Sequence, residues 1–356
     1  MLKIFFKNSL INYKIYNPYH IPKFFIIIYL LFNIFTLRIF ELKTSKKIKI
    51  GIIGLKHHQN IGNNLLKYAI YTKLSQFGFE PHIIGTLQRN VNISFIMKFS
   101  NVRIVNSFSQ INEKDYDILM VNSDQTWRRW SKDFYDIAFL KFAQNWNINK
   151  FVYGTSLGFN SWKFSKEDEI IAKNSLKNFT GISVREKLSI KLIDNHLGIK
   201  PFLVLDPTLL IDKKYYLKII KNYKCYINIK GKYIFTYNIQ KSNIIDNFIK
   251  YTSRKLNYEI FNVKTSDNEY VEKFIFGIYN SKAVITNSYH GTLFSIIFNK
   301  PFISFEKKND ERFNSLKDLL GINERIFKYN EEPNINLLKK KPNINKLIIN
   351  ELAYFC

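Results

Sequence analysis

The sequence predicts an α/β protein with two Rossmann-like domains that face each other across a cleft. Short apolar runs alternate with stretches long enough for a helix, which is typical of parallel strands joined by helical crossovers. The alternation starts again after Asp206-Pro207-Thr208, so two successive α/β halves meet near residues 206–212. A chain of 356 residues, 46% of them hydrophobic, is long enough to give each half a core of its own.

In each half the expected strands are short apolar runs that end in polar turns. In the first half they are residues 48–53, 82–84, 118–121, 151–155, 181–184 and 202–205, with a helix over 61–77 that Gly78 ends. In the second half they are residues 233–237, 258–263, 283–286 and 302–305, with helices over 243–256 and 271–279 and after His290. We therefore divide the chain into an extension (1–46), a first domain (47–205), a second domain (206–330) and a tail (331–356).

The extension contains a strongly apolar run over residues 24–37, between Lys23 and Arg38. This uncharged run falls short of the roughly 20 apolar residues of a spanning helix, and no small-residue cleavage site follows it. Basic flanks with interleaved aromatic residues suit a helix in the membrane interface, but a helix packed on the body of the protein explains the run equally well. We expect a cytoplasmic protein, at most peripheral on the inner face of the cytoplasmic membrane.

Charge and cysteine content narrow the classes of partner. The net charge is +26, yet the sequence has no RNA-binding aromatic signature, helix-turn-helix pattern or arginine-rich run, which argues against nucleic acid as a partner. An anionic membrane surface or a phosphorylated substrate explains the charge as well. Cys225 and Cys356 lie far apart, and no Cys/His cluster has zinc-ligand spacing, so we expect neither a disulfide framework nor a metal or other cofactor.

Polar residues gather where the predicted strands end, which is where α/β sheets bind ligands. After the first strand, Asn60, Asn63 and Asn64 surround Gly62, and their amides can cap the helix or bind a hydroxylated ligand. After the strand over 118–121 come Ser123, Asp124, Gln125 and Trp127. Asp124 can accept a proton from a sugar hydroxyl with Gln125 orienting its neighbours, or it can cap a helix. Trp127 can stack on a sugar ring or pack in the core.

Two further strand ends carry groups suited to anions. Arg185 follows the strand over 181–184, and its planar guanidinium matches carboxylate or phosphate oxygens, although a surface salt-bridge network with Glu186 is the alternative. Ser288, His290, Gly291 and Thr292 follow the strand over 283–286 and open a helix, whose N-terminus favours an anion. Beside an anion the protonated form of His290 is favoured, so it is a candidate catalytic acid.

These segments, in this order, resemble the polysaccharide pyruvyl transferase family over roughly residues 48–325. The matching segments are Asn60-Ile61-Gly62-Asn63, Ser123-Asp124-Gln125 with Trp127, Tyr153-Gly154-Thr155-Ser156-Leu157-Gly158, Ile182-Ser183-Val184-Arg185-Glu186, Leu205-Asp206-Pro207-Thr208-Leu209-Leu210, Asn287-Ser288-Tyr289-His290-Gly291-Thr292 and Arg312-Phe313. Two positions depart from the family pattern: Asn122 stands where glycine is more frequent, and Ile61 where tyrosine is common.

The resemblance implies a glycosyltransferase-B-like fold and transfer of a pyruvyl group from phosphoenolpyruvate to two hydroxyls of a sugar or lipid-linked oligosaccharide, which forms a cyclic ketal. On this hypothesis His290 and Asp124 are the catalytic acid and base. The expected donor ligands are Arg185, Ser288, Gly291 and Thr292, and the expected acceptor ligands are Asn60, Asn63, Asn64, Ser123 and Gln125. Two other readings stay open: a glycosyltransferase that uses a nucleotide sugar, and a non-enzymatic, membrane-associated glycan-binding protein.

Overall fold

The computed structural model of the chain describes residues 47–54, 60–86, 94–122, 125–128, 132–223, 231–267, 269–306 and 310–344. Contacts divide the chain into two compact units, of which Ile48–Ala353 holds all the strands and helices described below. The apolar helix expected before residue 47 lies outside the described residues. Among the helices in the described part of the chain, none has both the length and the apolar character needed to cross a membrane.

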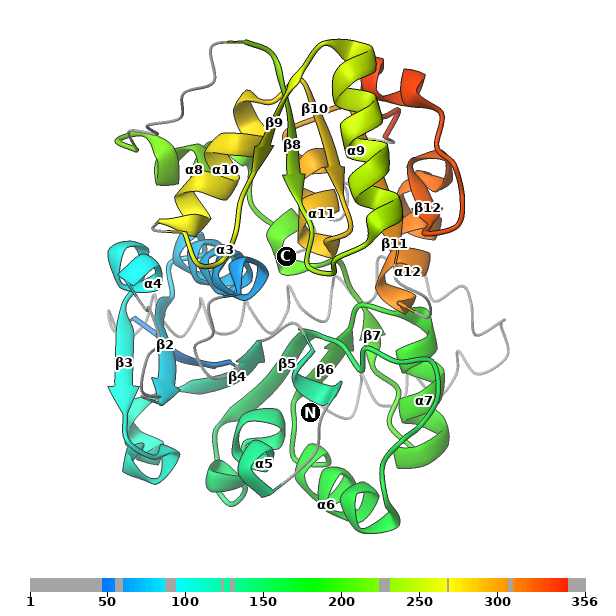
Figure 1. Cartoon of the computed structure of the whole chain (residues 1–356). Helices are drawn as coiled ribbons and strands as arrows, with labels where there is room; N and C mark the ends of the chain where they lie inside the picture. Colours follow the sequence, from blue (N-terminus) through cyan, green and yellow to red (C-terminus); the bar gives the residue numbers. More distant parts are fainter. Residues whose placement is uncertain are drawn as a thin grey trace. The chain divides into compact units, whose positions relative to one another are not determined.

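The first half of this unit forms a seven-stranded sheet in the order β3-β2-β1-β4-β5-β6-β7, and every neighbouring pair is parallel (Figure 1). The strands are β1 (Lys49–Ile53), β2 (Glu80–Thr86), β3 (Val102–Val105), β4 (Ile118–Asn122), β5 (Asn149–Thr155), β6 (Gly181–Val184) and β7 (Phe202–Leu203). The α-helices are α3 (Ile61–Gln76), α4 (Ser94–Phe99), α5 (Lys132–Phe139), α6 (Lys166–Leu176) and α7 (Lys187–Leu197).

The second half forms a five-stranded sheet in the order β12-β11-β10-β8-β9, again parallel throughout. The strands are β8 (Tyr233–Tyr237), β9 (Glu259–Asn262), β10 (Ala283–Thr286), β11 (Phe302–Glu306) and β12 (Ile326–Lys328). The α-helices are α8 (Lys213–Ile220), α9 (Asn243–Leu256), α10 (Tyr270–Asn280), α11 (Tyr289–Ile297) and α12 (Glu311–Leu320). Two Rossmann-like sheets of parallel strands confirm the predicted fold class.

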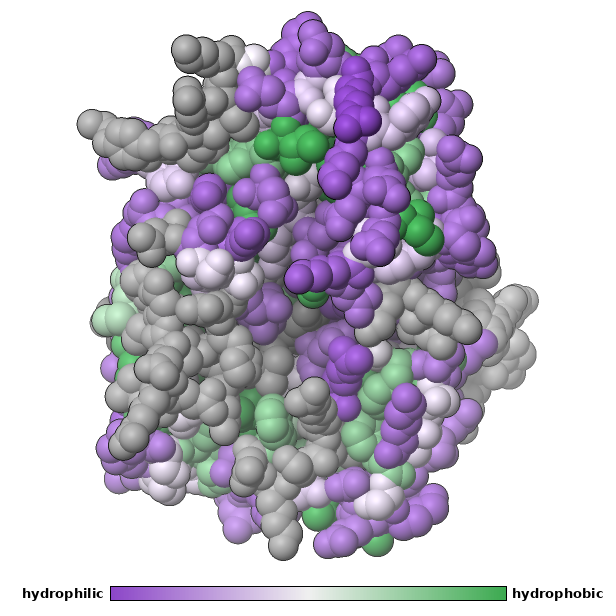
Figure 2. All heavy atoms as spheres, viewed as in Figure 1, coloured by the Kyte–Doolittle hydropathy of each residue, from purple (hydrophilic) through white to green (hydrophobic). Residues whose placement is uncertain are grey.

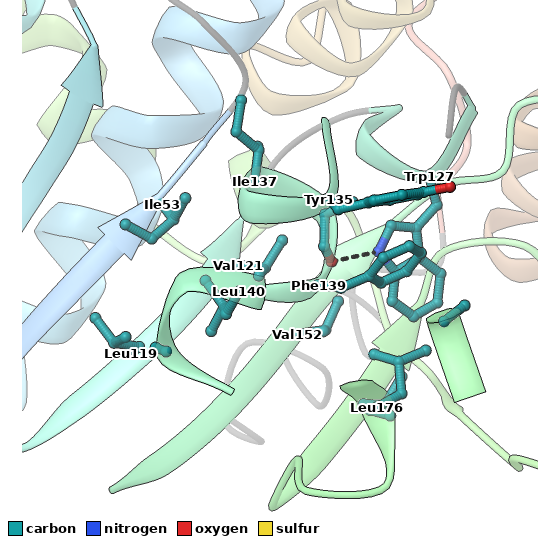
Figure 3. Close-up of a cluster of buried hydrophobic side chains, with 14 of the residues drawn as sticks. Ile53, Leu119, Val121, Trp127, Tyr135, Ile137, Phe139, Leu140, Val152 and Leu176 are labelled. Atoms are coloured by element: carbon teal, nitrogen blue, oxygen red, sulfur yellow. Dashed lines mark hydrogen bonds between the residues drawn. The ribbon is translucent and has the colours of Figure 1, made fainter. Parts of the chain in front are cut away.

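Each sheet is associated with a hydrophobic core. In the first core, Trp127 lies among Val121, Phe139 and Val152, and its indole Nε1 donates a hydrogen bond to the carbonyl of Ala138 at 2.9 Å (Figure 3). The side chain is fully buried, so Trp127 packs in the core instead of presenting its ring to a sugar.

The second core extends beyond the last strand into the predicted tail. Leu338, in a 3-10 helix over Ile335–Lys339, packs with Ile303 and Phe305 of β11. Arg325 donates hydrogen bonds to the carbonyls of Leu337 and Lys341. The described part of the tail is therefore attached to the second sheet, and the exact domain boundaries remain a prediction.

The strand orders identify where ligands should bind. In a doubly wound sheet the site lies beyond the carboxyl ends of the two strands between which the chain reverses its winding. That point falls between β1 and β4 in the first sheet and between β8 and β10 in the second. The loops after these strands lead to Asn60, Gln125, Ile239 and Asn287, respectively. All four residues line the cavity described next.

Candidate active site

A cavity of about 390 Å³ lies at the carboxyl ends of the strands of both halves. Residues of the first half that line it are Asn60, Gly62, Gln125, Arg128, Gly158, Phe159, Asn160 and Lys163. Residues of the second half that line it are Tyr237, Ile239, Gln240, Asn287, Ser288, Tyr289, His290, Asp310 and Arg312. The lining is largely polar, as expected of a site for a charged or hydroxylated ligand.

Three helices begin at this cavity, and the capping residue of each lines its wall. Asn60 caps α3 by accepting a hydrogen bond from the backbone N–H of Asn63 at 3.0 Å. Ser288 caps α11 by accepting from the backbone N–H of Gly291 at 3.2 Å, and Asp310 caps α12. Each helix N-terminus carries a partial positive charge of about half a unit. Three of them around one cavity favour an anionic ligand.

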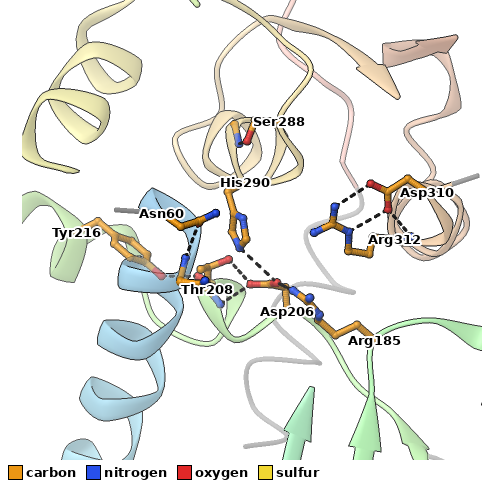
Figure 4. Close-up of polar contacts among 11 residues, drawn as sticks. Asn60, Arg185, Asp206, Thr208, Tyr216, Ser288, His290, Asp310 and Arg312 are labelled. Atoms are coloured by element: carbon orange, nitrogen blue, oxygen red, sulfur yellow. Dashed lines mark hydrogen bonds and ion pairs between the residues drawn. The ribbon is translucent and has the colours of Figure 1, made fainter. Parts of the chain in front are cut away.

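His290 belongs to a buried polar cluster at the base of α11 (Figure 4). Its Nε2 lies 3.8 Å from Oδ2 of Asp206, the carboxylate oxygen that also pairs with the guanidinium of Arg185. The other oxygen of Asp206 accepts hydrogen bonds from the backbone N–H and the hydroxyl of Thr208, at 2.9 and 2.6 Å. Asp206 is thus held by three groups, and it provides a fixed counter-charge for a protonated imidazole.

The other side of the imidazole rests against the first turn of α3. A Cβ atom added to Gly62 would lie 2.1 Å from Nδ1 of His290 and 2.4 Å from its Cε1. Only glycine leaves room for the ring at this distance. The backbone of one half therefore fixes the catalytic candidate carried by the other half.

Tyr289 links the two arginines of the region. The guanidinium carbons of Arg185 and Arg312 lie 5.6 and 4.9 Å from the centre of its ring, within the range of cation–π attraction. Burial, reinforced by the Asp206 carboxylate, raises the pKa of the Tyr289 hydroxyl far above its usual value, so the ring stays neutral. Arg312 donates to both carboxylate oxygens of Asp310, at 2.9 and 2.8 Å, from a position on the cavity wall.

The first half contributes a basic and aromatic wall. Arg128 donates a hydrogen bond to Oε1 of Gln125 at 2.8 Å. Gly158, with φ of +68°, passes so close that a Cβ there would lie 2.6 Å from Nε2 of Gln125. Beyond it, the ammonium of Lys163 lies 5.7 Å from the ring centre of Phe159. An aromatic ring beside two cations and an amide is suited to an anionic sugar or to a phosphorylated ligand.

The structure brings four of the predicted site residues to the cavity wall: Asn60, Gln125, Ser288 and His290. Ser123 and Asp124 lie outside the described residues. Arg185 is buried against Asp206, and neither it nor the buried Glu186 belongs to a surface salt-bridge network.

The other predicted residues lie behind the cavity wall. Asn63 and Asn64 are buried in α3, and the amide of Asn64 donates to the hydroxyl of Tyr270 at 2.8 Å. Gly291 packs against Thr286, where a Cβ would lie 2.5 Å from the hydroxyl oxygen. Thr292 bonds to the Ser288 carbonyl and the Ser304 hydroxyl. The ligand-binding roles of all these residues stay predictions.

Sequence reasoning did not assign roles to Asp206, Arg312, Asp310, Arg128 or Lys163. Asp206 and Arg312 do fall within segments that carried the family resemblance, which was the available signal. Arg128 and Lys163 lie in a lysine-rich chain without any motif that sets them apart.

Comparison with known families identifies the chain. A sequence profile described as polysaccharide pyruvyl transferase matches residues 60–309, which is well over half of the chain and includes most of the cavity wall. The chain belongs to the polysaccharide pyruvyl transferase family. This pyruvyltransferase therefore acts on a polysaccharide or sugar acceptor. No curated protein sequence matches it.

One solved structure supports the fold. A protein described as a UDP-N-acetylglucosamine 2-epimerase from Listeria monocytogenes superposes with a TM-score of 0.52 at 12% identity, over 87% of this chain and 91% of that one. A UDP-GlcNAc 2-epimerase from Neisseria meningitidis gives 0.49 at 8% identity, over 86% and 92%. The first likeness identifies the fold as glycosyltransferase-B-like and carries no information on the substrate of the pyruvyltransferase.

Proposed function

We propose that this pyruvyltransferase uses phosphoenolpyruvate as its donor and forms a pyruvate ketal on two hydroxyls of a sugar. The observation that carries the proposal is the convergence of three helix N-termini on a cavity lined by His290 and Arg312. Phosphoenolpyruvate is a small trianion with a carboxylate at one end and a phosphate at the other. Two separated anionic groups suit a cavity at which several helix N-termini, each with a partial positive charge, meet from different directions.

Arg312 is better placed than Arg185 to contact the donor. It lines the cavity, whereas Arg185 is buried and paired with Asp206. We assign direct binding of a donor anion to Arg312, and we assign to Arg185 the positioning of Asp206. Asp310 then orients the guanidinium of Arg312 through its two hydrogen bonds.

The chemistry needs one proton on carbon and one on phosphate. His290 protonates the methylene carbon of the donor, which makes the adjacent carbon electrophilic, and a sugar hydroxyl attacks that carbon as it loses its proton. The C–O bond to phosphate then breaks, the second hydroxyl closes the ring, and its proton leaves with the phosphate. The two hydroxyl protons thus balance the new methyl C–H bond and the released hydrogen phosphate.

The remaining roles follow from position and chemistry. Asp206 keeps the His290 ring in place and balances its positive charge. Gln125 and Asn60 offer amides to the acceptor hydroxyls from the wall of the first half. Asp124 lies two positions after the end of β4 in the sequence and remains our candidate base for the acceptor hydroxyl.

Ligand-induced thermal stabilisation tests the donor. Phosphoenolpyruvate at about 100 times its dissociation constant should stabilise the fold by about 2.7 kcal/mol, which raises Tm by several degrees. His290→Ala and Arg312→Ala should each lose most of that shift, and Lys191→Ala, an exposed charge on α7, should keep it. Stabilisation by UDP-N-acetylglucosamine, with none by phosphoenolpyruvate, would instead identify a nucleotide-sugar glycosyltransferase.

A further inference from the structure

A second cavity, of about 580 Å³, lies at the carboxyl ends of β8 and β9. It adjoins the cavity of about 390 Å³ to which we assign phosphoenolpyruvate, called the donor cavity from here on. Its lining residues are Thr236, Tyr237, Asn238, Ile239, Gln240, Lys241, Asp246, Ile249, Lys250, Ile260, Asn262, Val263, Lys264 and Thr265. Tyr237, Ile239 and Gln240 line both cavities, so the two are neighbours across the loop that follows β8.

Asn287, which lines the donor cavity, holds the loop between the two cavities through its side chain and its backbone. Oδ1 of Asn287 accepts a hydrogen bond from the backbone N–H of Ile239 at 2.7 Å, and Nδ2 donates to the carbonyl of Gln240 at 2.7 Å. The backbone N–H of Asn287 in turn donates to the side chain of Asn238 at 3.0 Å. These three bonds fix the rim of the second cavity relative to His290, so a ligand can meet both cavities in one defined geometry.

The lining of the second cavity has the composition of a site for sugars. Ile239 and Ile260 are 62% and 41% exposed, and together they offer apolar surface to the C–H faces of sugar rings. Figure 2 shows hydrophobic side chains in a mainly hydrophilic face near β8 and β9. Asn262 and Gln240 add amides that can bind hydroxyls, and Gln240 also reaches the donor cavity.

The charge of the second cavity is positive. Lys241, Lys250 and Lys264 line it, opposed by Asp246 alone. Within the part of the chain that the structure describes, none of these three ammonium groups forms an ion pair. Lys264 also feels the charge of the nearby Asp267 carboxylate, but an acidic group on a bound sugar would gain attraction without breaking an ion pair of these lysines.

We propose that the second cavity is a subsite for the acceptor glycan, in which sugar units next to the modified one bind and an acidic unit contacts Lys250 and Lys264. This inference rests on the proposed function, since the acceptor must reach the donor cavity. The chain of sugars crosses Ile239 from one cavity to the other, and the acceptor is thereby an anionic oligosaccharide, carrying either carboxylates or phosphates.

Lysine acetylation followed by mass spectrometry tests the subsite directly. The probes are a galacturonate pentamer, a phosphorylated mannose pentamer and neutral maltopentaose. An acidic pentamer at ten times its dissociation constant should slow acetylation of Lys250 and Lys264 about tenfold, because about nine-tenths of the sites are then filled. Lys166 and Lys200, with side chains 86% and 81% exposed elsewhere on the chain, should react at unchanged rates.

Charge-matched variants separate a subsite from diffuse attraction to a basic protein. Lys250→Ala/Lys264→Ala should weaken binding of the preferred acidic pentamer by about two- to fivefold per lysine. Lys166→Ala/Lys200→Ala removes the same charge and should leave the affinity unchanged. Equal protection of all four lysines, protection by maltopentaose alone, or no protection would each overturn the subsite.

The protection of Lys250 and Lys264 from acetylation does not depend on binding of the donor. Loss of the lysine protection, with stabilisation by phosphoenolpyruvate intact, would overturn the subsite and leave the proposed reaction standing. Comparison of the two acidic pentamers distinguishes carboxylates from phosphates, because the preferred probe protects at the lower concentration.

Discussion

Replacing Gly62 by alanine tests the packing of the catalytic histidine against α3. The added methyl would lie 2.1 Å from Nδ1 of His290, whereas ordinary contacts begin near 3.4 Å, so the ring must move by more than an ångström. Gly62 has no unusual positive φ, so alanine fits the backbone there. The clash with one side chain is therefore separable from any backbone effect.

The expected magnitudes follow from two opposing terms. Alanine in place of glycine stabilises a helix by up to about 1 kcal/mol, while forcing a side chain out of a packed position costs about 1–3 kcal/mol. In the wild-type background we expect Gly62→Ala to be destabilising by about 1 kcal/mol. In a His290→Ala background the clash is gone, and the same change should be neutral or stabilising.

Urea denaturation of the four proteins of this double-mutant cycle gives the coupling free energy. We expect a coupling of about 1–3 kcal/mol between Gly62 and His290. A displacement of about an ångström at a catalytic group also lowers turnover on the order of a hundredfold. A coupling near zero, or a Gly62→Ala enzyme with normal turnover, would refute the placement of His290 against α3.

Three further changes test other parts of the structure. Burial raises the pKa of Glu186 above its ordinary value of 4.5, against an opposing effect of Arg185. The protonated Glu186 carboxyl therefore stabilises the fold at pH values below its pKa in the unfolded chain, and this stabilisation is lost as pH rises through its pKa in the folded protein. Glutamine cannot ionise, so Glu186→Gln should reduce the fall in urea midpoint over that pH range. Trp127→Phe should lower the free energy of unfolding by about 1–3 kcal/mol, because it removes a hydrogen bond and leaves a cavity. The KM for the acceptor should not change; a raised KM would indicate that the indole stacks on a sugar. Arg185→Lys should lower kcat more than it weakens phosphoenolpyruvate binding measured by calorimetry, because the arginine positions Asp206. A larger effect on binding than on kcat would instead indicate that Arg185 contacts the donor directly.

The sequence was sufficient to predict the fold class because parallel strands joined by helical crossovers give a regular alternation of apolar runs and helix-length segments. Short apolar strands and the longer helices between them can be recognised from their spacing alone. The strands β3 and β12 escaped prediction because each has only three or four residues, one of which is Arg103 or Lys328, so neither contains an apolar run long enough to be recognised.

Part of the site was predictable for a similar local reason. Asn60 and Ser288 cap the first helices that follow β1 and β10, so their position can be predicted from the neighbouring sequence. Asp206 is different, since its meeting with His290 depends on two segments 84 positions apart that approach only in the folded protein. Arg312 likewise reaches the cavity through the position of α12, which no local pattern determines.

The most direct test of the donor assignment is proton NMR of the reaction in D2O. The enzyme is incubated with phosphoenolpyruvate and a panel of neutral and acidic oligosaccharides, the latter carrying carboxylates or phosphates, and phosphate release is followed in parallel. We predict phosphate release matched by a new ketal methyl signal that carries one deuteron from solvent, and loss of both with His290→Ala. Transfer of a sugar from UDP-N-acetylglucosamine to the same acceptors, with phosphoenolpyruvate left intact, would contradict the account.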